Sequence, residues 1–298
     1  MRIRALMVLM LLTVVAFMPL VGAQVEELLY AYGNVTRLSV EGANVTVLVN
    51  ELNNAINLTQ RGEVKGAVAI VNSIMSQVPS LEANARLHTL VVSVEYGSLV
   101  IALIAIIALI YVKRRELIGS IWLRFRGSSV VKVGSGRART LIYNEEAAAI
   151  VLALIIILAV FITAQSVVSR EAEAFSAIGL LGPGGRIGGY PSVVYVNTSL
   201  SLYVFVYNHM NKPIWYVVKV YLLNASNTAQ PPLNATPLLT YERILLNNQS
   251  WVAPLNLTIN NTGSYRLLAE LWLYNPVNLT LTYTGEYVQL WFNATGVG

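Results

Sequence analysis

The chain of 298 residues contains no cysteine and no aspartate. Without cysteine there is no disulfide framework and no thiolate metal site. All 15 acidic residues are glutamate, so aspartate-containing catalytic triads, aspartate-based calcium loops and aspartate-anchored magnesium sites are excluded as well. Charged residues of any kind make up only 12% of the sequence. Together with a mean hydropathy of +0.59, this composition indicates a membrane protein.

The positive charge is concentrated in one short segment. Residues 113–146 hold eight Lys and Arg against three Glu, and this excess equals the net charge of +5 of the whole chain. Positive charge beside apolar segments is typical of the cytoplasmic side of a membrane. The sequence therefore predicts a basic cytoplasmic loop at 113–146 and no nucleic-acid partner.

Three apolar segments define the expected topology. Residues 1–23 have a positively charged start, an apolar stretch and small residues at the end, a pattern that predicts a secretory signal peptide. An uncleaved anchor there would give the same topology. Residues 95–112 and 147–168 flank the basic loop and predict two transmembrane helices in a lipid bilayer.

The segment 24–94 is expected to form a small extracellular helical hairpin. Apolar residues recur at spacings of three and four on both sides of a break at Arg61-Gly62. Pro79 is expected to stop the second helix, and Ser80 to begin a third that continues into the first membrane segment.

After a linker at 169–190, the chain alternates apolar and polar residues with period two. The fold class predicted for the chain is therefore an α+β membrane protein whose residues 191–298 form an antiparallel, immunoglobulin-like β-sandwich. The expected strands lie at 192–196, 200–206, 214–222, 238–246, 251–259, 265–274 and 286–293.

Asn-x-Ser/Thr acceptor sites for N-linked glycans occur in two clusters, and none falls between Asn57 and Asn197. Such sites mark surface backbone on the outer side of a membrane. They predict that 24–94 and 169–298 are extracellular, and that the partners of the chain include N-linked glycans. Asn256 and Asn260 alternate with apolar residues, so their glycans are expected to project from the solvent face of a strand. The eleven acceptors are Asn34, Asn44, Asn57, Asn197, Asn224, Asn234, Asn248, Asn256, Asn260, Asn278 and Asn293.

The C-terminal part resembles a known family. The stretch 175–186 reads FSAIGLLGPGGR, and Tyr190-Pro191, Asn208-His209, Gly263-Ser264-Tyr265 and 271–274 (LWLY) follow. Over roughly 172–293 this pattern resembles the β-domain of the DUF1616 family, archaeal membrane proteins of unknown function. One departure is Met210, where the family usually has glutamate. The resemblance implies the architecture and no activity.

We identify no catalytic, cofactor-binding or metal-binding residues. The chain has two histidines, His88 and His209, too few for a metal site without cysteine or aspartate. His209 is expected to be a turn residue that bonds the backbone of a hairpin. Because no nucleophile, base and orienting residue can be assembled, the chain is not expected to be an enzyme.

Aromatic residues form the most distinctive pattern in the expected strands. If the neighbouring aliphatic residues face the core, the aromatic residues would form an outward contact surface. The alternative is an ordinary sheet with aromatic cross-strand pairs, or a face covered by the 175–190 segment. The residues of this possible contact surface are Tyr203, Phe205, Tyr207, Trp215, Tyr221, Trp272 and Tyr274.

These features favour a membrane-anchored cell-envelope protein with a glycosylated extracellular domain for binding or scaffolding, whose partner is another envelope protein. An accessory subunit of a membrane transport or secretion complex is the alternative. A channel formed by this chain alone is disfavoured, because the expected spans lack the polar residues of a substrate path.

Overall fold

The computed structural model describes residues 25–125 and 173–296, together with residues 153, 156, 157 and 160. The chain divides into two compact units, one formed by Met1–His88 with Glu173–Gly298 and the other by Thr89–Ala172. The predicted signal peptide at 1–23, the greater part of the loop at 113–146 and nearly all of the segment at 147–168 lie outside the described residues.

Three helical segments precede the β-structure. Residues 25–40 are helical, α2 spans Thr46–Gln60 and α3 spans Val64–Phe125. Gly42 and Gly62 follow the first two segments with φ of 90° and 79°, a left-handed conformation that glycine adopts at low cost at the end of a helix. The break expected at Arg61-Gly62 is therefore confirmed.

Pro79 was expected to end a helix, but it lies inside α3. A proline in a helix removes one backbone hydrogen bond and crowds the preceding turn. Pro79 is exposed, while Val78 and Ala85 around it are buried. Packing of the apolar residues on either side of Pro79 therefore outweighs the loss of one hydrogen bond.

The prediction of two transmembrane helices is wrong. Within the part of the chain that the structure describes, no helix is long and apolar enough to cross a membrane. The first expected span, 95–112, is an uninterrupted part of α3. Its continuous apolar run begins only at Leu99, after Glu95 and Ser98, and ends at Val112. About 14 residues give roughly 21 Å of helix, against about 30 Å for the hydrocarbon core.

The C-terminal part contains eight strands in two sheets. The three-stranded sheet has the order β1-β3-β6 and the five-stranded sheet the order β2-β8-β7-β4-β5. The bounds are β1 Phe175–Leu181, β2 Val193–Tyr195, β3 Ser199–His209, β4 Ile214–Asn224, β5 Leu239–Leu245, β6 Ser250–Thr258, β7 Gly263–Tyr274 and β8 Leu281–Thr295. The prediction of a β-rich C-terminal domain is therefore confirmed.

The core of this domain lies between the two sheets. Leu202, Val204 and Val206 of β3 are buried in one cluster with Tyr216 and Val218 of β4. In β3 buried residues alternate with more exposed ones along the whole strand, because successive side chains of a strand point to opposite faces. The aliphatic residues of β3 thus face inward and its aromatic residues face outward.

The predicted antiparallel, immunoglobulin-like sandwich needs correction, because the five-stranded sheet is mixed. β2 pairs with β8 in parallel, with Val194 opposite Ala294. The chain also contains a strand that the sequence analysis assigned to the linker, β1, which pairs antiparallel with β3. After β1 the glycine-rich segment 182–190 leads to the other sheet, where β2 lies in the same direction as β8.

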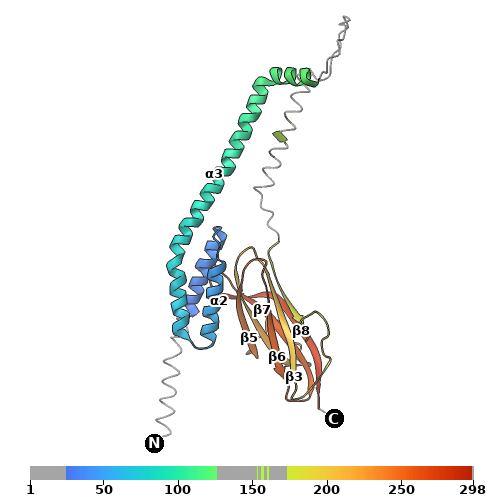
Figure 1. Cartoon of the computed structure of the whole chain (residues 1–298). Helices are drawn as coiled ribbons and strands as arrows, with labels where there is room; N and C mark the ends of the chain where they lie inside the picture. Colours follow the sequence, from blue (N-terminus) through green and yellow to red (C-terminus); the bar gives the residue numbers. More distant parts are fainter. Residues whose placement is uncertain (1–24, 126–152, 154–155, 158–159, 161–172, 297–298) are drawn as a thin grey trace. The chain divides into compact units, whose positions relative to one another are not determined.

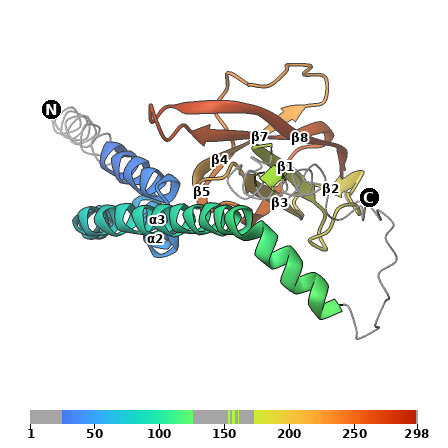
Figure 2. The ribbon, with the colours of Figure 1, turned by 90° about the horizontal axis from the view of Figure 1, so that it is seen from above.

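The helices of this unit pack against the five-stranded sheet. Figure 1 shows α2 beside β5, and the view from above in Figure 2 also places β5 next to the helices. A single buried cluster combines residues of the helical segments, such as Tyr32 and Leu52, with Trp215, Val217 and Ile244 of the sheet. The helical segments and the β-domain therefore share this buried cluster.

Candidate functional site

Tyr32 links the helical segment 25–40 to two strands of the five-stranded sheet. Its side chain is fully buried, and its ring meets the indole of Trp215 edge-on with centroids 5.8 Å apart. The hydroxyl donates a hydrogen bond to the carbonyl of Tyr274 at 3.1 Å and accepts one from the backbone N–H of Trp215 at 3.2 Å. Burial raises the pKa of Tyr32 far above its ordinary value, so the phenol stays neutral.

α2 makes a second polar contact with the sheet, at its edge strand β5. Asn53 Nδ2 donates to the carbonyl oxygen of Ile244 at 2.9 Å, and the N–H of Ile244 donates to Asn53 Oδ1 at 2.8 Å. Because β5 is an edge strand of the sheet, these backbone groups have no neighbouring strand on that side. The Asn53 carboxamide satisfies both of them, which protects the edge from pairing with another chain.

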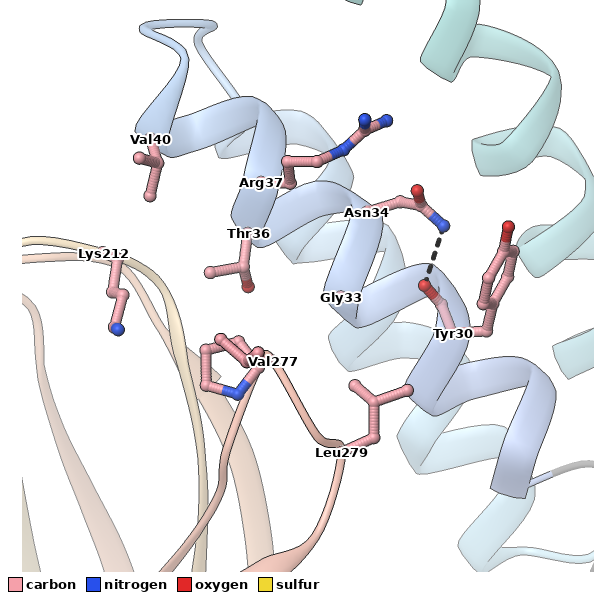
Figure 3. Close-up of a pocket in the computed structure, with 10 residues that line it drawn as sticks. Tyr30, Gly33, Asn34, Thr36, Arg37, Val40, Lys212, Val277 and Leu279 are labelled. Carbon is pink, nitrogen blue, oxygen red and sulfur yellow. Dashed lines mark hydrogen bonds between the residues drawn. The ribbon is translucent and has the colours of Figure 1, made fainter.

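A pocket with a volume of about 440 Å³ lies between the helical segment 25–40 and two β-turns. Figure 3 shows that Arg37 extends away from Lys212, and that Lys212 comes from the β3–β4 turn. The Arg37 guanidinium pairs instead with Glu82 of α3 at 3.4 Å. Since the two cations do not converge on one point, the pocket offers no site for an anion. Its remaining lining is largely apolar: Tyr30, Gly33, Asn34, Thr36, Val40, Pro276, Val277 and Leu279.

The aromatic residues of the possible contact surface do not form one surface. Tyr203, Phe205 and Tyr207 lie on the outward face of the three-stranded sheet, each partly exposed. Trp215 and Tyr221 belong to the five-stranded sheet and are buried, each with only 3% of its surface exposed. The core of the domain therefore lies between these aromatic residues of β3 and the two of β4.

Trp272 and Tyr274 also belong to the five-stranded sheet, and both are half-buried. Tyr274 packs against Trp215 with ring centroids 4.8 Å apart. Trp272 lies under the ammonium of Lys219, which is 3.7 Å from the ring centroid, and donates its indole N–H to Glu270 Oε2 at 2.9 Å. These contacts are internal to the sheet and match the alternative of aromatic cross-strand pairing.

The outward face of the three-stranded sheet is the open face of the domain. Phe205 lies opposite Gly179 of β1 and Val252 of β6. Val252 is 47% exposed and Phe175 is 48% exposed. None of the strands β1, β3 and β6 contributes to the buried cluster that holds the helices. These residues form a strip that we call the outward apolar face: Phe175, Tyr203, Phe205, Tyr207 and Val252.

Two carboxylates of the domain, Glu270 and Glu242, are engaged in structural contacts. Glu270 is fully buried, and its Oε1 accepts a hydrogen bond from the N–H of Leu233 at 2.6 Å. Desolvation raises the pKa of Glu242, although its hydrogen bond with Trp215 Nε1 opposes the effect. Among the described residues there is no group of three or more metal-binding side chains.

Asn208 is buried and holds the start of the β3–β4 turn. Its Nδ2 donates to the carbonyls of Lys212 at 2.9 Å and Leu245 at 2.8 Å. Its Oδ1 accepts from the N–H of Met210 at 3.0 Å and from the hydroxyl of Tyr216 at 3.2 Å. The Asn-His pattern that carried the family resemblance is thus a structural element, because all four hydrogen-bonding positions of the Asn208 carboxamide are used.

His209 was expected to form a hydrogen bond with the backbone. In the structure its partner is another side chain. Its Nδ1 is 2.6 Å from Asn248 Oδ1, and Tyr207 also donates its hydroxyl to that oxygen, at 3.3 Å. This cluster could not be predicted from the sequence, because His209 and Asn248 are 39 residues apart. Part of the cluster could be predicted, because strict alternation in β3 places Tyr207 and His209 on the same face of the strand.

The structure places ten of the eleven acceptor asparagines at exposed positions. Asn256 and Asn260 are exposed beside the buried Leu255, Leu257 and Ile259, as their alternation predicted. Asn34 is the exception. It is half-buried, its Nδ2 donates to the carbonyl of Tyr30 at 3.0 Å, and the same nitrogen lies 3.9 Å from the sulfur of Met75.

The fold and its surface define a β-rich domain with a helical segment packed on its five-stranded sheet. Residues 169–293 match the family model of DUF1616, described as a domain of unknown function. The resemblance expected over 172–293 is therefore confirmed for this part of the chain. A comparison with curated proteins gives no match.

Several solved structures are similar to about two fifths of the chain. The CARDB domain of a Pyrococcus furiosus protein, in complex with di-metal ions, is 17% identical and has a TM-score of 0.30, covering 43% of this chain and 97% of that domain. A β-glucosidase from Listeria innocua in complex with glucose is 12% identical with a TM-score of 0.30, covering 42% of this chain and 16% of the enzyme. A β-glucosidase from Erythrobacter marinus is 13% identical with a TM-score of 0.27, covering 40% of this chain and 16% of that enzyme.

Proposed function

We propose that this protein is a non-enzymatic binding or scaffolding module of the cell envelope, which contacts a protein partner through the outward apolar face. The observation that carries the proposal is the position of two glycan acceptors at opposite ends of this face. Asn256 lies on β6 opposite Ser201, and Asn248 lies in the turn before β6, within hydrogen-bond distance of Tyr207.

The apolar character of the face supports a protein partner. Val252 exposes about half of its surface, and the partly exposed rings of Tyr203 and Phe205 lie on the neighbouring strand. Aromatic residues surrounded by polar ones are typical of protein–protein contacts. Glycans at both ends of the strip would limit the directions from which a partner approaches, and would discourage contacts with other proteins.

The fixed position of the helical segment supports a scaffold. Tyr32 and Asn53 form hydrogen bonds with the backbone of the five-stranded sheet and hold the helices there. The three-stranded sheet on the other side of the core is therefore left uncovered, and the shape of its outward face is set when the domain folds. A preorganised face loses little conformational entropy on binding. The pocket in Figure 3 has a largely apolar lining, and its two cations do not converge on one point.

The proposal is tested by binding of the full glycosylated chain to envelopes isolated from cells that naturally make it. Val252→Glu places a charge in the outward apolar face, whereas Val277→Glu changes a residue that is 88% exposed in the β7–β8 turn. We expect Val252→Glu to reduce the retained fraction at least tenfold, because a buried unpaired carboxylate costs several kcal/mol at an interface, and Val277→Glu to bind like the wild type. Equal retention of both variants would contradict the proposal.

A further inference from the structure

Three rings meet at one end of the outward apolar face. The ring centroids of Phe175 and His209 are 5.0 Å apart, those of Phe175 and Tyr207 are 6.0 Å apart, and those of Tyr207 and His209 are 6.1 Å apart with planes at 13°. All three residues are partly exposed. We call them the aromatic trio.

The carboxamide of Asn248 lies against this trio. Its Oδ1 is held by His209 Nδ1 at 2.6 Å and by the hydroxyl of Tyr207 at 3.3 Å. A contact of 2.6 Å requires that His209 carries its proton on Nδ1 and donates it. Within the described part of the chain, Asn248 Nδ2 makes no hydrogen bond, and the residue is exposed. The oxygen is therefore fixed while the nitrogen remains accessible.

Backbone geometry keeps Asn248 in this position. The residue has φ of 61°, a left-handed conformation in which asparagine is tolerated better than most residues. Its N–H donates to the carbonyl of Asn208 at 2.7 Å, which ties the β5–β6 turn to the end of β3. Ser250, the hydroxyl residue of the acceptor site, is the first residue of β6 and is exposed.

Other acceptor sites lack this arrangement. Asn224 Oδ1 accepts a hydrogen bond from Ser226 of its own site at 2.8 Å, and Asn278 Oδ1 accepts one from Thr280 at 2.7 Å. Both form local turns that involve only their own site. At Asn293, Oδ1 accepts a hydrogen bond from Ser264 of another strand at 2.7 Å. Asn248 differs because two residues of another strand hold its oxygen, and both belong to the aromatic trio.

We propose that Asn248 is N-glycosylated and that the first sugar of its glycan packs on the aromatic trio. The donor is a glycosyl phosphate. The bond between Nδ2 and the anomeric carbon forms while the bond from that carbon to the phosphate oxygen breaks, and Nδ2 releases one proton. Nothing is oxidised or reduced. Because the apolar face of a pyranose ring can lie on aromatic rings, the attached sugar covers apolar surface that is otherwise exposed.

This inference does not depend on a protein partner for the outward apolar face, and it predicts that one glycan among many stabilises the fold. The test uses the full chain from a glycosylating host and from a host without N-glycosylation. Ser250→Ala removes the acceptor signal but keeps the Asn248 carboxamide. Thr262→Ala removes the signal at Asn260, which is also exposed, and serves as the matched control.

Glycopeptide mass spectrometry of the wild type should find Asn248 occupied. We expect Ser250→Ala to lower the Tm of the glycosylated protein by about 2–4 °C, and Thr262→Ala to lower it by less than about 1 °C. In protein without glycans, both substitutions should leave the Tm unchanged. Phe175→Ala should reduce the difference in Tm between the Asn248-glycosylated and unglycosylated forms, since it removes one of the three rings on which the sugar packs.

Three results would each overturn the inference. The first is an unoccupied Asn248 in the wild type. The second is an equal change of the Tm in Ser250→Ala and Thr262→Ala. The third is a change in Ser250→Ala that persists without glycans, because the serine would then act through the fold and not through the sugar.

Discussion

The carboxamide of Asn53 forms hydrogen bonds with both backbone groups of Ile244, at 2.9 and 2.8 Å. A helix side chain thereby takes the place that a further strand would have at the edge of the five-stranded sheet. The contact joins the helical segment to the β-domain across 191 residues of sequence. Because the carboxamide occupies these backbone groups, they are not available for pairing with a strand of another chain.

Replacing Asn53 by alanine should destabilise the unit by about 2 kcal/mol, because it leaves the backbone N–H and carbonyl of Ile244 without partners in a partly buried place. Urea denaturation followed by circular dichroism measures the change. Asn54→Ala, at the exposed neighbouring position of α2, should change the free energy of unfolding by less than about 0.5 kcal/mol. An equal effect of both substitutions would contradict a structural role of Asn53.

Tyr32→Phe should cost about 1–3 kcal/mol, since the buried N–H of Trp215 and the carbonyl of Tyr274 both lose their hydrogen-bond partner while the ring packing is retained. Tyr30→Phe is the control, because Tyr30 lies on the same helical segment and is 60% exposed. Thermal and urea denaturation compare the two. A loss of stability in Tyr30→Phe as large as in Tyr32→Phe would show that the effect does not come from the contact with the sheet.

Glu242→Gln should stabilise the protein at neutral pH. Desolvation raises the pKa of the Glu242 carboxyl in the folded state, so the folded protein holds the proton more tightly than the unfolded chain. The contribution of Glu242 to stability is therefore complete below the unfolded pKa and falls as the pH rises through the folded pKa. Glutamine keeps an oxygen for the indole N–H of Trp215 without this penalty.

The measurement for Glu242→Gln is the free energy of unfolding from pH 4 to pH 7. The advantage of the variant over the wild type should grow as the pH rises, and should be smallest at the acid end. An advantage that is constant over the range, or one that falls with pH, would rule out the desolvated carboxylate as the cause.

Tyr216 should make the protein sensitive to alkali. Burial raises the pKa of its phenol to about 12, so the unfolded chain loses this proton near pH 10 while the folded protein keeps it. Between pH 10 and 12 the linkage removes about 2–3 kcal/mol from the stability of the wild type. In Tyr216→Phe this part of the pH dependence should disappear, although the variant is less stable at pH 8 because Asn208 and Ser176 lose a partner. Identical slopes of wild type and variant above pH 10 would contradict the assignment.

Sequence patterns predicted much of the β-domain because alternation there reflects a local rule. In β3 and β6 every second residue faces the core, and the sequence alone placed Asn256 on the solvent side. β1 was missed because its small residues Ala177 and Gly179 break the alternation. The parallel pairing of β2 was missed because a strand of three residues carries too little pattern to show its direction.

The docking of the helices on the sheet could not be predicted from any local pattern. One signal was available in β4, where Ile214, Trp215, Tyr216, Val217 and Val218 form a continuous apolar run and are all buried. Such a run is typical of a strand covered on both faces. The prediction of two transmembrane helices was wrong for another reason, since apolar composition does not establish how long an apolar helix is.

The central claim is that the outward apolar face binds a protein of the envelope. Site-specific incorporation of a photo-crosslinking amino acid at Val252, in cells that naturally make the chain, tests it most directly, with position 277 as the exposed control. The account predicts that one defined protein crosslinks to position 252 and not to position 277, and that Phe205→Ser in the same chain abolishes the product. The claim is contradicted if position 252 yields no crosslinked protein, or if both positions yield the same products.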